Sequence, residues 1–108
     1  EDILNGLMQN AKINESGRLA THVQGAICTG LSKKYKYIHN LGVKKAPFYV
    51  LLGATMPSIL IETSFISNKR ECRRLLNENY QNYLCETIID GIESYIKETN
   101  PEKFVSTQ

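Results

Sequence analysis

The sequence is poor in the side chains that bind transition metals. It has two histidines, His22 and His39, which form no ligand motif, and three cysteines without metal-ligand or redox spacing. A catalytic zinc ion takes about three protein ligands and a water molecule, so we assign no metal ligand in this chain. An odd number of cysteines gives no support for a disulfide framework. Cys28 and Cys85 fall on apolar helical stripes, where we expect small core residues.

Long apolar runs and a strong net charge are also missing. No run approaches the length of a membrane span, and no signal peptide opens the chain. The net charge of +2 is too small to argue for nucleic acid. A basic, tyrosine-rich loop at residues 35–47 has the composition of a single-strand-binding surface, but it is short, and we expect no nucleic-acid partner. The 108 residues, 42% of them hydrophobic, suit one globular domain.

The hydrophobic pattern predicts an α/β fold with two strands and about three helices. Residues 48–52 (FYVLL) and 58–62 (SILIE) are short apolar runs typical of strands. Because so few residues separate these runs, they would be antiparallel if they pair. Helices are expected at residues 17–35, 69–76 and 79–97. Two strands rarely make an independent sheet, which indicates that the chain lacks further strands.

These elements divide the chain into a central unit and two flanks. Residues 1–16 are expected to be a connecting segment with short helical turns, residues 17–97 the α/β unit, and residues 98–108 a polar tail. The helix at 17–35 should bury one face against the sheet. Gly91 lies in the apolar stripe of the last helix, where it allows close packing at some cost in helix propensity.

An acidic residue directly follows the second apolar run. Pro57 opens this run and Glu62 ends it, while Asn68 and Glu71 have the three-residue spacing of a capping box. A strand, an acidic residue, a short loop and a helix would place Glu62 near the carboxyl end of a strand, where α/β proteins bind ligands. From its position alone, the Glu62 carboxylate is expected to be a solvated surface group without a function. A functional role for Glu62 therefore has to be argued from the sequence motif around it.

The motif at residues 56–68, MPSILIETSFISN, resembles the second conserved block of the zinc-dependent N-acetylmuramoyl-L-alanine amidases, the amidase-3 family of cell-wall hydrolases. By this resemblance, Glu62 is the catalytic acidic residue. Residues 14–20 (NESGRLA) resemble the start of the family's helix before the substrate-side loop. Residues 42–48 (GVKKAPF) resemble the stretch that borders the substrate groove. The resemblance therefore implies substrate contacts from Gly42, Lys44 and Ala46.

One position of this groove departs from the family. Leu41 stands where the family usually carries Arg, so this chain lacks a guanidinium there. The resemblance covers residues 14–97 and implies the C-terminal half of a three-layer, mixed-sheet amidase domain. The missing N-terminal half would hold the first strands and the blocks of D-P-G-H-G and S-x-H-x-N type. Those blocks supply two His zinc ligands, and a Glu between them supplies the third.

The reaction that the resemblance implies is hydrolysis of the amide bond between N-acetylmuramic acid and L-alanine. Zinc-activated water would attack the carbonyl, with Glu62 as general base and then general acid. The implied partner is bacterial peptidoglycan, and the implied location is the periplasm, the cell wall or the outside of the cell. We expect the chain alone to be inactive and prone to self-association. A non-catalytic peptidoglycan-binding module with the same fold is the alternative, while the three motifs disfavour an unrelated α/β adaptor.

Overall fold

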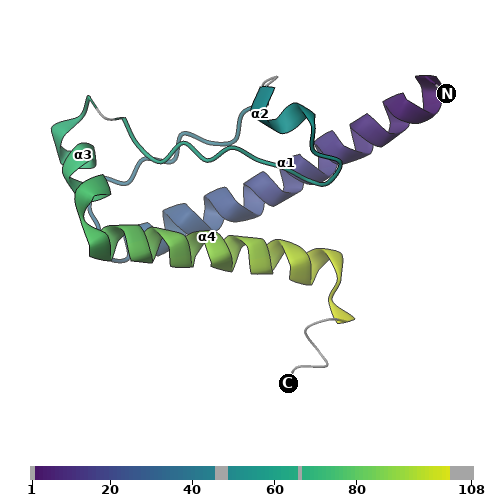
Figure 1. The fold of residues 1–108 in the computed structure, drawn as a ribbon. Helices are drawn as coiled ribbons and strands as arrows, with labels where there is room; N and C mark the ends of the chain where they lie inside the picture. Colours follow the sequence, from purple (N-terminus) through teal and green to yellow (C-terminus); the bar gives the residue numbers. More distant parts are fainter. Residues whose placement is uncertain (1, 46–48, 66, 103–108) are drawn as a thin grey trace.

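Two long antiparallel helices form the body of the molecule. The computed structural model describes residues 2–45, 49–65 and 67–102. Within them, helix α1 spans Asp2–Ser32 and helix α4 spans Glu78–Thr99, and the two run side by side in opposite directions (Figure 1). The short helices α2 (Tyr49–Leu52) and α3 (Lys69–Leu76) lie between them in sequence. Residues 38–45 and 57–65 form no regular secondary structure, and Figure 1 draws them as elongated stretches of chain.

The apolar stripe of α1 forms one side of the core, as its helical spacing predicts. Val23, Ile27 and Leu31 are buried against Tyr80 and Leu84 of α4. The partner of this stripe is therefore another helix, not the sheet that the sequence suggested. Close approach of the two helices depends on glycine: a Cβ built on Gly91 would lie 2.5 Å from the Val23 Cα atom. The expectation that Gly91 allows close packing is confirmed.

Helix α1 extends much further toward the N-terminus than predicted. Residues 2–16, expected to contain only short helical turns and a connection, continue the same helix. Gly6 costs helix propensity there without ending the helix. Its apolar side chains have no cover within the described chain, because Ile3 is 81% exposed and Leu4, Leu7 and Met8 are 61–62% exposed. An uncovered apolar face of this size marks a surface that another element or molecule can bury.

The predicted α/β sheet is absent from the described residues, which contain no strand. Residues 49–52 form the single turn α2, and Phe48, the first residue of that predicted strand, lies outside the described residues. Residues 57–65 are extended, and Ile59 and Ile61 pack on the core while Leu60 is 47% exposed. This alternation is that of a strand with one buried face. A sheet also requires a second extended segment to pair the backbone groups, and the Ser58 N–H instead donates to the Ser16 side chain.

The predicted start of α3 is confirmed, although only the Asn68 half of the capping box forms, since the Asn68 N–H donates to the Phe65 carbonyl. The Asn68 side chain accepts hydrogen bonds from the backbone N–H groups of Arg70 and Glu71, so α3 begins at Lys69 as expected. Asn77 ends α3 and caps α4 through the Tyr80 N–H. The last helix runs two residues beyond the predicted end, to Thr99, which places Glu98 in a helix and not in a tail. Cys28 is half-buried, but Cys85 is exposed, so its assignment to the core is wrong.

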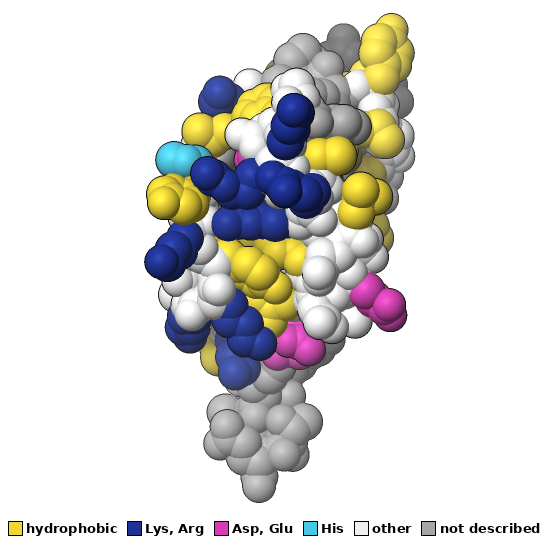
Figure 2. Space-filling model, turned by 90° about the vertical axis from the view of Figure 1, so that its left-hand side faces the viewer, with side chains coloured by type: hydrophobic (Ala, Val, Ile, Leu, Met, Phe, Trp, Pro, Cys, Tyr) yellow, Lys and Arg dark blue, Asp and Glu magenta, His cyan; other side chains and the backbone are white. Residues whose placement is uncertain are grey.

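Basic side chains gather at one end of the helix pair. Figure 2 shows Lys and Arg side chains covering the face that lies at α3 and at the C-terminal end of α1. None of the helices in the described ranges is long and apolar enough to cross a membrane.

Candidate functional site

Glu62 lies on the extended segment at residues 57–65. The alternation that turns Ile59 and Ile61 toward the core leaves the Glu62 side chain exposed. It makes no hydrogen bond or ion pair with any residue in the described ranges. No cation or backbone donor of the described chain occupies its oxygens, so the carboxylate is open to contact with another molecule.

The loop that carries Gly42 and Lys44 is tied to α1. Gly42 has a φ of 85°, a left-handed conformation that glycine adopts without a steric penalty. Its N–H donates to the Asn40 side-chain oxygen at 2.9 Å, and Gln24 of α1 donates to the same oxygen at 2.9 Å. Lys44 is exposed, and Ala46 lies outside the described residues. No hydrogen bond or ion pair links Glu62 to Gly42 or Lys44 in the described chain.

The histidines of this chain do not form a zinc site. His22 Nε2 lies 2.5 Å from a Glu98 carboxylate oxygen, and its Nδ1 lies 2.8 Å from the Ser94 hydroxyl. His39 is exposed in the loop after α1. The described residues hold no group of three His, Cys, Asp or Glu side chains that could bind a metal ion. The donor set present therefore does not fit zinc, which needs about three ligands converging on one point.

A polar network that the sequence did not reveal joins α1 to α4. Arg18 forms ion pairs with Glu98 at 2.7 Å and with Glu15 at 2.9 Å. The Tyr95 hydroxyl donates to the second Glu15 oxygen at 2.5 Å. This hydrogen bond lowers the pKa of Glu15, and the Arg18 guanidinium lowers the pKa of Glu98, with His22 contributing to the latter. The network holds the end of α4 against the middle of α1.

Local sequence gave little sign of this network. Arg18 and His22 are four positions apart, as are Ser94 and Glu98, so each pair shares one edge of its helix. The partners are 72 to 80 positions apart in the chain, and Glu98 was expected in a polar tail. Only the packing of α1 on α4 brings the two edges together.

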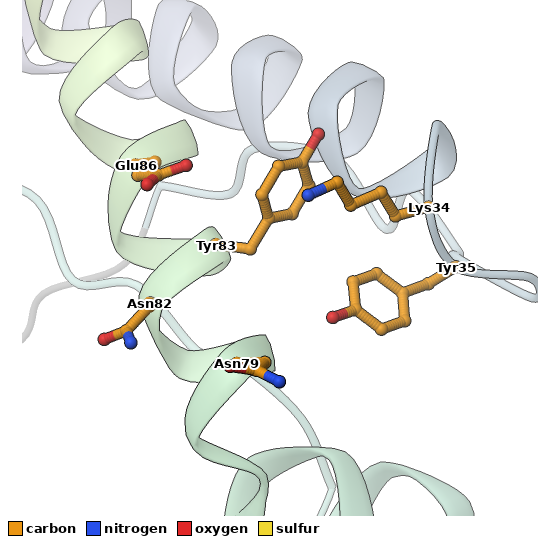
Figure 3. Close-up of a pocket in the computed structure, with 6 residues that line it drawn as sticks. All are labelled: Lys34, Tyr35, Asn79, Asn82, Tyr83 and Glu86. Atoms are coloured by element: carbon orange, nitrogen blue, oxygen red, sulfur yellow. The ribbon is translucent and has the colours of Figure 1, made fainter.

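A shallow cavity of about 280 Å³ lies where α1 ends beside α4. Lys34 and Tyr35 line it from the turn after α1, and the α4 residues Asn79, Asn82, Tyr83 and Glu86 line it from the other side (Figure 3). The Tyr83 hydroxyl donates to the Gly30 carbonyl at 2.9 Å, and the Lys34 ammonium lies 4.2 Å from the centre of the Tyr83 ring. Glu62 does not line this cavity, so the cavity and the predicted catalytic residue are separate features.

Comparison with known proteins identifies the chain's relatives. The sequence pattern of N-acetylmuramoyl-L-alanine amidases matches residues 5–94. Over 82 residues, the chain is 35% identical to the N-acetylmuramoyl-L-alanine amidase LytC of Bacillus subtilis. Over 95 residues, it is 32% identical to the N-acetylmuramoyl-L-alanine amidase AmiA of Escherichia coli. Over 80 residues, it is 36% identical to the uncharacterized protein YqiI of Bacillus subtilis. No solved structure matches the chain.

The matched regions cover most of this chain but little of its relatives. They include 74%, 76% and 88% of this chain for YqiI, LytC and AmiA, but only 36%, 16% and 31% of those proteins. The chain therefore corresponds to a minor part of each relative's length.

Proposed function

Because the chain belongs to the N-acetylmuramoyl-L-alanine amidase family, we propose that it is the C-terminal half of a peptidoglycan amidase domain. In this proposal the amidase-like unit spans residues 17–97, and residues 1–16 and 98–108 flank it. The observation that carries it is the family match over residues 5–94, together with the amidase relatives. The fraction of each relative that is matched leaves ample length for an N-terminal half.

The exposed surfaces of the described chain are consistent with a missing half. The segment at residues 57–65 leaves Leu60 47% exposed and Phe65 63% exposed. The first turns of α1 present uncovered Ile3, Leu4 and Leu7 side chains. In the complete domain, apolar surface of the N-terminal half would cover these side chains and the start of α1.

In the proposed reaction Glu62 moves the proton. Its carboxylate accepts a proton from the attacking water and then donates it to the nitrogen of the leaving L-alanine. The bond between the lactyl carbonyl carbon and this nitrogen breaks, leaving a free carboxylate on the sugar and a free amine on the peptide. Gly42, Lys44 and Ala46 would border the groove that holds the substrate, with the Lys44 ammonium available to a substrate carboxylate.

Zinc is the cofactor that the family resemblance implies. When bound, it polarises a carbonyl and lowers the pKa of water. The described residues of this chain provide no ligand set for it, so we propose that the N-terminal half supplies the ligands. The proposal also places the protein outside the cytoplasm, in the periplasm, the cell wall or the medium, because peptidoglycan is found there.

The test compares two glutamine variants in the longer protein that the proposal requires. Glu62→Gln keeps the shape of the side chain and removes its ability to carry a proton, so release of peptide stems from purified peptidoglycan should fall by about a hundredfold or more. Glu93→Gln, an exposed glutamate of α4, is the matched control and should keep normal release. Near-normal release by Glu62→Gln would rule out the catalytic assignment.

Sedimentation with insoluble peptidoglycan separates the enzyme from a non-catalytic binding module. If the protein is an enzyme, the unchanged protein should release peptide stems and the Glu62→Gln variant should still sediment with the polymer. Binding without release by the unchanged, zinc-loaded protein would favour the binding module.

A further inference from the structure

The small net charge of the chain conceals a strong separation of charge. Seven of its thirteen Lys and Arg residues lie in two short segments, at residues 33–37 and 69–74, which contain a single acidic residue, Glu71. These segments together carry a formal charge of +6, and the remainder of the chain therefore carries −4, given the net charge of +2. A concentration of one sign at one place attracts molecules of opposite charge even when the whole protein is nearly neutral.

The fold brings the two segments into one surface. Arg74 of α3 donates a hydrogen bond to the Lys36 carbonyl at 2.5 Å. The Arg70 guanidinium lies 4.3 Å from the centre of the Tyr37 ring, and that of Arg74 lies 5.5 Å from the centre of the Tyr35 ring. We name this surface the basic face, and Figure 2 shows it from the front. It consists of Lys33, Lys34, Lys36, Lys69, Arg70, Arg73 and Arg74.

Contacts with the arginines hold the loop of the basic face in an uncommon conformation. Tyr37 has a φ of 62°, in the left-handed region that non-glycine residues adopt at a cost of roughly 1 kcal/mol. Lys33, Lys36 and Lys69 are exposed, and their ammonium groups make no hydrogen bond or ion pair within the described residues. The arginines thus organise the surface, while these lysines leave their charge available to a ligand.

The aromatic rings of the basic face are occupied by its own cations. Tyr37 is covered by Arg70 and Tyr83 by Lys34, while Tyr35 packs edge-on against Tyr80 with ring centres 4.9 Å apart. Proteins that bind single-stranded nucleic acid use open aromatic faces on which bases stack. Arg70 covers one face of the Tyr37 ring, which stays 64% exposed, and Lys34 covers one face of the Tyr83 ring, so charge is the main feature that the surface presents.

We propose that the basic face binds a linear polyol-phosphate polymer, in which phosphodiesters link units that carry no bases, and recognises it through its phosphates. Arg70, Arg73 and Arg74 lie at helical spacings of three and four, so they share one edge of α3. Guanidinium groups bind phosphate oxygens in pairs, and the surrounding lysines add point charges. The basic face carries seven positive charges, which is more than the few carboxylates of one peptide can neutralise. A phosphate polymer supplies one negative charge at every repeat. The expectation that the protein meets such a polymer in the cell wall rests on the proposed function. The charge and geometry of the basic face are independent of that proposal.

The test measures binding of fluorescently labelled poly(glycerol phosphate) to the 108-residue chain by anisotropy across a salt series. Affinity should fall as salt rises, because each neutralised phosphate releases counterions. The double variant Lys33→Gln/Lys69→Gln should bind about tenfold more weakly and lower the slope of log affinity against log salt by roughly 1.4. The control, Lys12→Gln/Lys97→Gln, removes the same charge from α1 and α4 away from the basic face and should leave binding within about twofold. Circular dichroism melts of both variants establish that they keep the fold.

Two competitors give the remaining outcomes. Poly-L-glutamate should compete weakly, and single-stranded DNA with the same number of phosphates should bind no more tightly than poly(glycerol phosphate). Absence of binding at low salt, equal losses in the two double variants, or equal competition by poly-L-glutamate would overturn the proposal. Much tighter binding of DNA would overturn it in favour of a nucleic-acid partner. Because no hydrolysis is measured, failure here is distinct from failure of the Glu62 assay.

Discussion

The contact between Gly91 and Val23 makes a sharp prediction about stability. In the Gly91→Ala variant, the new methyl carbon would lie 2.5 Å from the Val23 Cα atom and 3.1 Å from the His22 carbonyl oxygen. Carbon atoms pack best about 3.5–4.0 Å apart, so the helices must separate by roughly 1 Å. The obstacle is backbone, which cannot rotate away as the end of a flexible side chain would.

Two opposing effects set the magnitude. Replacing a helical glycine with alanine improves helix propensity by about 1 kcal/mol. Overpacking a close contact costs roughly 1–3 kcal/mol, and separation also loosens the contacts of Val23, Ile27 and Leu84 in the core. We expect overpacking to win and the variant to be destabilised by about 1–2 kcal/mol. For a chain of this size, the midpoint of thermal unfolding should fall by roughly 5–15 °C.

The chain provides a matched control in Gly25 of α1. A Cβ at Gly25 would meet no atom within 4 Å, so Gly25→Ala should show only the gain in propensity, about 0.5–1 kcal/mol. Thermal unfolding followed by circular dichroism compares both variants with the unchanged chain. A Gly91→Ala variant as stable as Gly25→Ala would refute the close approach of α1 and α4.

Three further predictions concern pH, metal and association. The pKa values of Glu15 and Glu98 lie below their ordinary value of 4.5 in the folded chain, so the stability they contribute is present above about pH 4.5 and is lost as the pH falls through their lowered values. The urea midpoint of unfolding should therefore drop between pH 6 and pH 3. An equal drop in the Glu98→Gln variant would contradict this. After dialysis the chain should hold no stoichiometric zinc by atomic emission, since it offers no ligand set among the described residues, and one zinc per chain would show that His22 or His39 was misjudged. Light scattering across a dilution series should show self-association through the uncovered start of α1, and the Leu4→Glu/Leu7→Glu variant should associate less. A monomer at every micromolar concentration would contradict this prediction.

Local signals in the sequence were sufficient for the buried stripe of α1 and for the start of α3. The buried stripe of Val23, Ile27 and Leu31 follows from helical spacing. The start of α3 follows from Asn68, whose side chain accepts hydrogen bonds from nearby N–H groups. The family resemblance also rested on a continuous stretch around Glu62, which requires no knowledge of the fold, and the family match agrees with it. The role of Glu62 remains a prediction.

Tertiary structure decided everything that depends on partners distant in sequence. Residues 58–62 read as a strand, and residues 59–62 do alternate in exposure like one. A sheet forms only where a second segment pairs the backbone groups, and the described chain provides none. The start of α1 read as a connection, yet helix continuation prevailed over the propensity cost of Gly6. Glu98 read as tail, and it became a partner of Arg18 and His22 only because α4 continues past residue 97 and packs on α1. The net charge of the sequence likewise did not reveal the basic face. A net charge is a sum over the whole chain, whereas electrostatic attraction depends on which charges the fold places side by side.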